Sequence, residues 1–131
     1  MSQQRIVTVY RVVFWAILLF VLQQSLTPIP ASVFHSIWDK WLHLIAWFGV
    51  STSAYMAYGY QRQQYRIFIV IVIVAAIVEC GQLMVAGRVF SGLDIVANTL
   101  GCALGWGVVK GLESVFSADT LYRICGLKRC S

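Results

Sequence analysis

The sequence predicts an all-α membrane protein, a bundle of four transmembrane helices with both termini in the cytoplasm (N-in/C-in). Of its 131 residues, 60% are hydrophobic and only 11% are charged, whereas soluble domains carry roughly 25% charged residues to keep their surface in water. Four separate stretches are apolar over about 20 residues, the length that spans a bilayer. The basic residues also gather on one side of the resulting topology, as they do in membrane proteins.

The net charge of +5 does not indicate a nucleic-acid-binding protein. The basic residues form no dense run with interleaved aromatic residues, which is what such a protein presents. They stand singly at the ends of apolar stretches, where membrane proteins keep them. We therefore expect membrane lipids as the surroundings and partners of the chain, and no nucleic acid.

The first span is expected over residues 6–23. Arg5 and Arg11 precede an apolar run that resembles a signal peptide, but no small-x-small cleavage site follows the run. We expect a retained anchor. Pro28 and Pro30 then interrupt the helix, because each fixes φ and disfavours helix in the residue before it.

The other three spans are expected over residues 41–60, 67–86 and 93–112. Two short polar stretches, residues 61–64 and 87–92, connect the second span to the third and the third to the fourth. Residues 113–131 form a basic tail. Because the sequence contains no repeat and no low-complexity tract, residues 1–131 are expected to form a single transmembrane domain.

Lysine and arginine residues near the span ends predict the orientation. The side of the membrane that holds both termini carries eight of the ten basic residues: Arg5, Arg11, Arg62, Arg66, Lys110, Arg123, Lys128 and Arg129. The other side carries Lys40 and Arg88. Both termini are therefore expected in the cytoplasm.

Polar residues gather near the outer ends of the spans, although they come from stretches far apart in the sequence. They are Asp39, Lys40, His43, Glu79, Gln82, Arg88, Asp94 and Asn98. At a rise of 1.5 Å per residue, Glu79 is expected about 10 Å below the outer end of its span and Asn98 about 7 Å below its own. The inner halves of the spans carry no comparable set. The sequence thus predicts a polar site that faces the outside.

Helical spacing places these residues on shared faces, because residues three or four apart lie on the same side of a helix. The three faces consist of Asp39 with His43, of Glu79 with Gln82 and Ala86, and of Asp94 with Asn98. The last face continues into Gly101 and Gly105, a small-residue motif that lets helices approach closely in membranes. This motif predicts tight packing of the fourth helix against another helix. The other helix can belong to a second copy of the chain, so a homo-oligomer through the two glycines is possible.

Glu79 is the residue that most needs an explanation, because a carboxylate in a membrane span costs roughly 3 kcal/mol even on the lower insertion scales. It must be protonated, paired with a cation or in contact with water. The candidate partners are His43, Lys40 and Arg88.

Structural explanations also exist for most of these residues. Ser36-x-x-Asp39 and Ser91-x-x-Asp94 both fit a capping box at a helix start, so each aspartate can serve to close a helix end. Lys40 can be a basic residue that reaches for the interface.

The same holds for Arg88, while Gln82 and Asn98 can hydrogen-bond between helices. The gathering of all these residues on one side still favours a site. A metal centre on His43, Glu79 and Asp94 would have mixed nitrogen and oxygen ligands but only one histidine. We expect no metal and no cofactor.

The motifs resemble the signature of VanZ-like membrane proteins. The resemblance rests on Asp39-Lys40-x-x-His43, Glu79-x-x-Gln82, Gly87-Arg88 and Asp94-x-x-x-Asn98-x-x-Gly101, and it runs from Asp39 to about Gly105. It implies a multi-pass protein of the bacterial inner (cytoplasmic) membrane and of the cell envelope. The family is named for an accessory protein of glycopeptide resistance that protects against teicoplanin, an antibiotic, and no reaction is established for it.

The function favoured by these residues is the binding of a polar or anionic headgroup, such as that of a lipid-linked envelope precursor, in the outward-facing pocket. Lys40 and Arg88 would supply positive charge. Hydrogen bonding and orientation would come from His43, Glu79, Gln82 and Asn98, and the helix starts would be held by Asp39 and Asp94.

Two other classes of function use the same cluster. In an intramembrane enzyme acting on a lipid-linked substrate, His43 and Glu79 would be the catalytic acid–base pair. No nucleophile is placed well, since Ser91 is the single hydroxyl between Glu79 and Asp94, and Cys80 faces away from Glu79. A proton-coupled transporter would also use intramembrane Glu and His, but the polar residues stop halfway across and no inverted repeat is visible.

Overall fold

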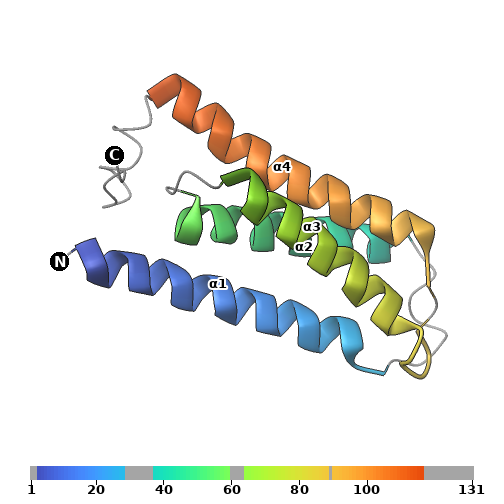
Figure 1. Ribbon diagram of the computed structural model, residues 1–131. Helices are drawn as coiled ribbons and strands as arrows, with labels where there is room; N and C mark the ends of the chain where they lie inside the picture. The colour runs from blue at the N-terminus through green and yellow to red at the C-terminus, as the bar shows by residue number, and fades with distance from the viewer. Residues whose placement is uncertain (1–2, 29–36, 60–63, 89, 117–131) are drawn as a thin grey trace.

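The computed structural model describes residues 3–28, 37–59, 64–88 and 90–116. The described residues form four α-helices: α1 (Gln3–Leu26), α2 (Ile37–Tyr58), α3 (Gln64–Gln82) and α4 (Gly92–Phe116). Successive helices run in opposite directions, so that the start of α1 and the end of α4 lie at the same end of the bundle (Figure 1). The predicted all-α bundle of four helices is confirmed.

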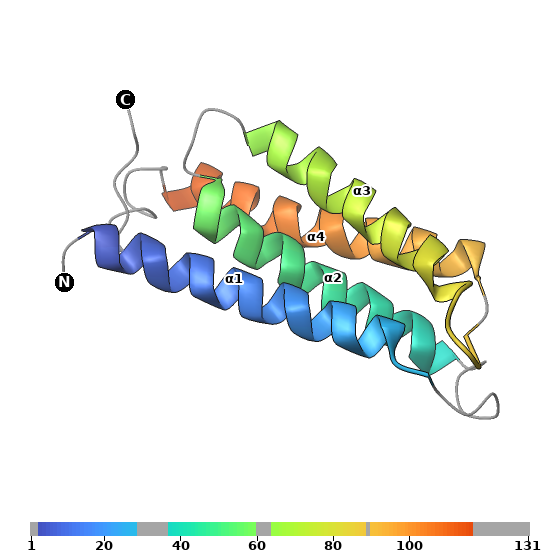
Figure 2. The same cartoon turned by 60° about the horizontal axis from the view of Figure 1, so that its bottom comes forward.

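The helix α2 is central to the bundle. Within the described residues, α2 and α3 each contact all three other helices, whereas α1 and α4 do not contact each other. The most extensive contact joins α2 to α4, and Figure 2 shows α2 between α1 and α4. Residues on α2 are therefore placed to meet residues from every other helix.

Three of the described helices, α1, α3 and α4, are long and apolar enough to cross a membrane. The helix α2 is not among them: it carries Asp39, Lys40 and His43 in its first half, and Ser51, Thr52 and Ser53 in its second half. That half contains no exposed residue, and Ser51 donates a hydrogen bond to the backbone oxygen of Cys102 on α4 (2.9 Å). A helix enclosed by its neighbours does not need an apolar surface, so α2 can cross the membrane alongside them.

The glycine stripe of α4 packs against α2. A Cβ atom on Gly101 would lie 2.3 Å from the backbone oxygen of Leu44, and one on Gly105 would lie 2.6 Å from that of Phe48. The predicted close packing of α4 is thus found within the chain. Because both glycines are covered by α2, a homo-oligomer through them has no free surface, and a second copy would have to bind another face. Whether the chain forms oligomers stays a prediction.

The helix α3 ends at Gln82, four residues before the expected boundary, and α4 continues four residues beyond its own, to Phe116. Leu83, Met84 and Val85 each donate to the backbone oxygen three residues earlier, which tightens the chain into turns. Gly87 then adopts a positive φ of 80°. Ala86 lies exposed in this connection, so the expectation that it shares a helix face with Glu79 is wrong.

Candidate functional site

The eight predicted site residues all lie at the end of the bundle where α2 and α4 begin and α3 ends. Six of them are buried, with exposed fractions between 0% and 9%: Asp39, His43, Glu79, Gln82, Asp94 and Asn98. Lys40 and Arg88 are half-buried. The position of α2 at the centre of the bundle explains why residues from α2, α3 and α4 meet there.

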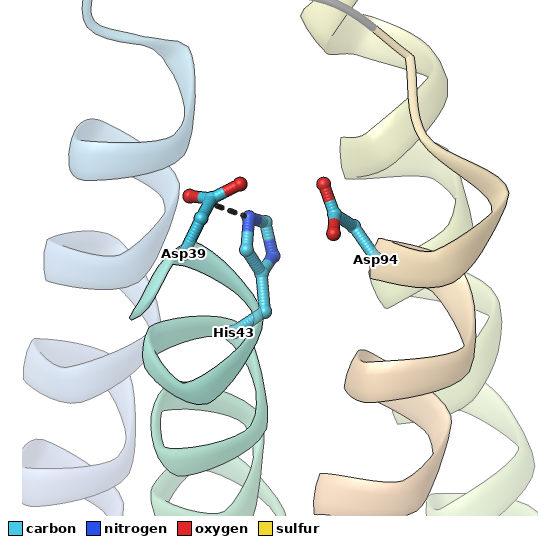
Figure 3. A group of neighbouring side chains, drawn as sticks. All are labelled: Asp39, His43 and Asp94. Atoms are coloured by element: carbon cyan, nitrogen blue, oxygen red, sulfur yellow. Dashed lines mark ion pairs between the residues drawn. The ribbon is translucent and has the colours of Figure 1, made fainter. Parts of the chain in front are cut away.

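Two direct contacts join the start of α2 to the start of α4. Lys40 Nζ forms an ion pair with Asp94 Oδ1 at 3.0 Å, and His43 Nδ1 lies 2.9 Å from Asn98 Oδ1. On the other side of its ring, His43 Nε2 lies 3.8 Å from Asp39 Oδ1 (Figure 3). His43 is thus held between a carboxylate and an amide.

Glu79 is fully buried (0% exposed), and it forms no ion pair with any described residue. Its Oε1 accepts a hydrogen bond from the backbone N–H of Ser91 (3.2 Å), and it interacts electrostatically with His43, Asp94 and Asp39. Two of the expected partners contact other groups. Lys40 pairs with Asp94, and Arg88 donates to backbone oxygens at the end of α1.

Arg88 connects the segment between α3 and α4 to the end of α1. Its Nε donates to the backbone oxygen of Thr27 (3.4 Å) and its Nη2 to that of Gln24 (2.5 Å). The last carbonyl groups of a helix lack partners inside the helix and carry partial negative charge. The guanidinium of Arg88 thus donates to one of these carbonyl groups, that of Gln24, and to the carbonyl group of Thr27 just after the helix.

The capping-box explanation holds only in part. The backbone oxygen of Ser91 accepts from the N–H groups of Asp94 (3.0 Å) and Ile95 (3.3 Å), so Ser91 does begin α4. In a capping box, the carboxylate of Asp94 would receive the N–H of Ser91. That N–H instead donates to Glu79. The start of α4 is therefore capped by a residue of the neighbouring helix α3. The other proposed box depends on Ser36, which lies outside the described residues.

Several buried polar atoms of the cluster have no hydrogen-bond partner among the described residues. They are Glu79 Oε2, Gln82 Nε2 and Asn98 Nδ2. A buried polar group left without a partner costs about 1–3 kcal/mol, and such groups are few in folded proteins. The cluster can therefore form further hydrogen bonds, to water or to a ligand, through these three atoms.

A pocket of about 330 Å³ opens beside the cluster, between α1 and α2. Its polar lining residues are Gln24, Ser25, Asp39, His43 and Arg88, and its apolar ones are Phe20, Val21, Leu42, Ala46 and Trp47. The polar residues come from the end of α1, the start of α2 and the connection after α3. The pocket is therefore polar at the end of the bundle and apolar towards its middle. No motif in the sequence indicated that α1 contributes to this pocket.

The opposite end of the bundle holds a second polar network, which the sequence analysis missed. The hydroxyl of Tyr55 donates to Glu113 Oε1 (2.6 Å), and Lys110 Nζ pairs with Glu113 Oε2 (3.1 Å) and also donates to Gln64. In the sequence, the spacing of three residues between Lys110 and Glu113 indicates that the two side chains lie on one face of a helix and can pair. This network joins α2, α3 and α4 at the end of the bundle where α2 ends and α3 begins.

An all-helical bundle with apolar outer faces and a buried polar cluster at one end defines a multi-pass membrane protein. The chain belongs to the VanZ/LLP1 family, whose family model matches residues 2–116. This match confirms the resemblance inferred from the motifs and extends it over α1, which carries none of them. No curated protein and no solved structure matches the chain.

Proposed function

We propose that the chain is a multi-pass protein of the bacterial cytoplasmic membrane whose outward-facing pocket binds the polar or anionic headgroup of a lipid or a lipid-linked envelope precursor. The observation that carries this proposal is the division of the pocket into a polar end and an apolar end. A lipid has the same division. A soluble polar ligand would leave Phe20, Leu42 and Trp47 without a complementary surface.

The distribution of basic residues supports an outward-facing pocket. Arg5, Arg11 and Lys110 lie in the first part of α1 or the last part of α4, at the end of the bundle away from the pocket. Positively charged residues favour the cytoplasmic side. The pocket end, which carries Lys40 and Arg88, is then the outer end, and the termini are cytoplasmic.

Charge and shape assign roles to the lining residues. Arg88 presents five N–H donors, of which the carbonyl groups at the end of α1 use only part, so it can also bind an anionic headgroup. Lys40, expected to share this role, is not among the lining residues and pairs with Asp94, whereas His43 adds a hydrogen-bonding group at the pocket wall. Phe20 and Leu42, both exposed, border the path of an acyl or isoprenoid chain.

An acid–base enzyme acting on the same lipid-linked substrate is the second candidate. His43 lies at the pocket wall between Asp39 and Asn98, which is how a general base is held in orientation. Glu79, the other member of the predicted pair, forms no hydrogen bond to His43 among the described residues. Cys80 is exposed on α3, so the nucleophile of such a reaction would be water. In this case His43→Ala should keep the bound lipid and stop its conversion.

The pocket is tested by filling it. Ala46 lines its apolar part, so Ala46→Leu places a larger side chain in the volume that a lipid chain would occupy. We expect the purified variant to lose most of the lipid that the parent retains, measured by mass spectrometry after extraction in mild detergent. Ala103→Leu is the control, because Ala103 is exposed on α4. Equal lipid content in both variants and the parent would contradict the proposal.

The family's link to teicoplanin is a further part of the proposal. If the bound lipid is a wall precursor on which the antibiotic acts, binding in the pocket would compete with the antibiotic for it. We expect expression of the chain in a teicoplanin-susceptible host to raise the minimum inhibitory concentration, and expression of Ala46→Leu at equal abundance to leave it unchanged. An equal rise with both would separate resistance from the pocket.

A further inference from the structure

Three side chains with metal-ligand chemistry meet between α2 and α4. Asp39 and His43 come from the first turns of α2, and Asp94 comes from the first turn of α4. Figure 3 shows their side chains pointing towards one another across the gap between the two helices. One candidate ligand atom from each lies within 4.8 Å of the others. The sequence disfavours a metal on His43, Glu79 and Asp94, and in the structure Asp39 takes the place of Glu79 in the set of neighbouring side chains.

The hydrogen bond to Asn98 determines which nitrogen of His43 is available. Asn98 Oδ1 can only accept, so His43 Nδ1, at 2.9 Å, must donate. In a neutral imidazole this leaves a lone pair on Nε2. His43 is 9% exposed, and Nε2 lies 3.8 Å from Asp39 Oδ1, beyond hydrogen-bonding distance. Metal-binding histidines are held in this way, with the second nitrogen donating to an oxygen of the protein.

The carboxyl groups around His43 also outnumber the side-chain cations that pair with them among the described residues. Asp39, Asp94 and Glu79 bring three carboxyl groups to the cluster. Lys40 is the cation that pairs with one of them, Asp94, and Arg88 donates to backbone carbonyl groups. Buried charges in proteins are paired or coordinate metals.

Glu79 supplies an independent observation. It is fully buried and interacts electrostatically with Asp39, His43 and Asp94, yet its Oε2 has no hydrogen-bond partner among the described residues. A cation bound by these three residues would lie among the groups with which Glu79 interacts and would offset the cost of its buried carboxyl group.

We propose that Asp39, His43 and Asp94 bind a divalent first-row transition-metal ion, Zn²⁺ or Mn²⁺. One imidazole nitrogen with two carboxylate oxygens is a donor set that suits these ions. Ligand atoms around a tetrahedral Zn²⁺ lie about 3.3 Å apart, so atoms that now lie within 4.8 Å of one another would approach by up to about 1.5 Å through side-chain rotation. Asp39 and His43 line the pocket, which supplies an entry path and an open coordination position.

Lys40 competes with the metal for Asp94, because its ammonium group already lies 3.0 Å from Asp94 Oδ1. This competition allows a test that a misfolded variant cannot imitate. Lys40→Met removes the competing cation and keeps all three ligands, so it should bind the metal at least about tenfold more tightly.

The experiment measures metal binding to chelator-treated protein in detergent, with Zn²⁺ or Mn²⁺ as the only addition. Cys125→Ser and Cys130→Ser are introduced in every sample to remove the thiols of the tail. We expect elemental mass spectrometry to find about one equivalent of metal per chain. We also expect the melting temperature to rise when the metal is added. Both should be lost in His43→Ala and Asp94→Asn. Asn98→Ala, which removes the positioning hydrogen bond, should weaken binding about 10–100-fold.

Glu113→Gln, in the network at the opposite end of the bundle, is the control and should keep the full equivalent. Less than a tenth of an equivalent in the parent, or equal binding by the parent and by His43→Ala, would overturn the metal site. Weaker binding by Lys40→Met would do the same. The metal site requires no bound lipid, and lipid is measured separately. Retained lipid without metal leaves the proposed function in place, and retained metal without lipid leaves the metal site in place.

Discussion

At the scale of single residues, Glu79 shows how a costly group is used in a membrane bundle. Because α3 ends at Gln82, Glu79 lies three residues from the helix end, about 4.5 Å along the axis, and not at the depth expected from a longer span. It is nevertheless fully buried. Its Oε1 receives the N–H of Ser91, one of the donors that a helix start leaves without a partner. Glu79 therefore holds α3 to the start of α4.

This hydrogen bond gives a prediction for two substitutions. Glu79→Ala leaves the N–H of Ser91 without an acceptor and should lower the free energy of unfolding by about 1–3 kcal/mol. Glu79→Gln keeps Oε1 as an acceptor, and since no described residue forms an ion pair with Glu79, it should stay within about 1 kcal/mol of the parent.

The measurement is unfolding by titration with a denaturing detergent. Asp94→Asn is the comparison, because it breaks the pair with Lys40 and leaves a partly buried ammonium group without its partner; we expect it to destabilise more than Glu79→Gln. If Glu79→Gln were as damaging as Glu79→Ala, the charge of Glu79 would matter more than its hydrogen bond.

At the scale of elements, the packing of α4 on α2 determines which polar residues meet. Gly101 and Gly105 allow the backbone of α4 to approach the carbonyl oxygens of Leu44 and Phe48. This close approach brings Asp94 to Lys40 and Asn98 to His43, because both pairs lie on the same two helices, nearer to their starts. The site is thus held by a backbone contact as well as by its own hydrogen bonds.

The glycine contact predicts the effect of adding one methyl group. In Gly101→Ala the new Cβ would lie 2.3 Å from a backbone oxygen, so α2 and α4 must move apart. We expect a loss of about 1–3 kcal/mol of stability, measured in the same detergent titration, together with weaker metal binding.

Gly107→Ala is the matched control on the same helix. No atom lies within 4 Å of its added Cβ, and alanine favours a helix over glycine by up to about 1 kcal/mol. We expect unchanged or higher stability. Equal stability of Gly101→Ala and Gly107→Ala would show that α4 does not approach α2 as closely as described.

At the scale of the whole molecule, the pocket lies at one end of the bundle, and the start of α1 and the end of α4 lie at the other (Figure 1). An even number of helices returns α4 to the end where α1 begins (Figure 1). The orientation in the membrane is then one choice for the entire bundle, and the basic residues favour cytoplasmic termini.

The orientation is tested by labelling single cysteines with a membrane-impermeant maleimide, after the four native cysteines are replaced. Met84 is 91% exposed in the connection after α3, so Met84→Cys should react in intact cells. Ser114→Cys, exposed near the end of α4, should react only after the membrane is opened. The reverse pattern would place the pocket on the cytoplasmic side and rule out an envelope precursor on the outer face as its ligand.

The sequence by itself determined the class of the protein and the polar residues that gather at one end of the bundle. Low charge and four apolar stretches predict a membrane bundle, since lipid must replace water around such a chain. Helical periodicity then places Asp39 with His43 and Asp94 with Asn98. These features are local, and no neighbouring helix can change them.

Only the tertiary structure decided how the site residues pair. Lys40 pairs with Asp94 and not with Glu79, and Arg88 binds the end of α1. The pocket wall from α1 and the network at the other end of the bundle are also visible only in three dimensions. Spacing along one helix fixes a face, but the partner of that face depends on how helices rotate and approach, which here follows from a backbone contact at Gly101. The apolar run after Gln82 is compatible with helix or turn, so the depth of Glu79 was likewise decided by the folded chain.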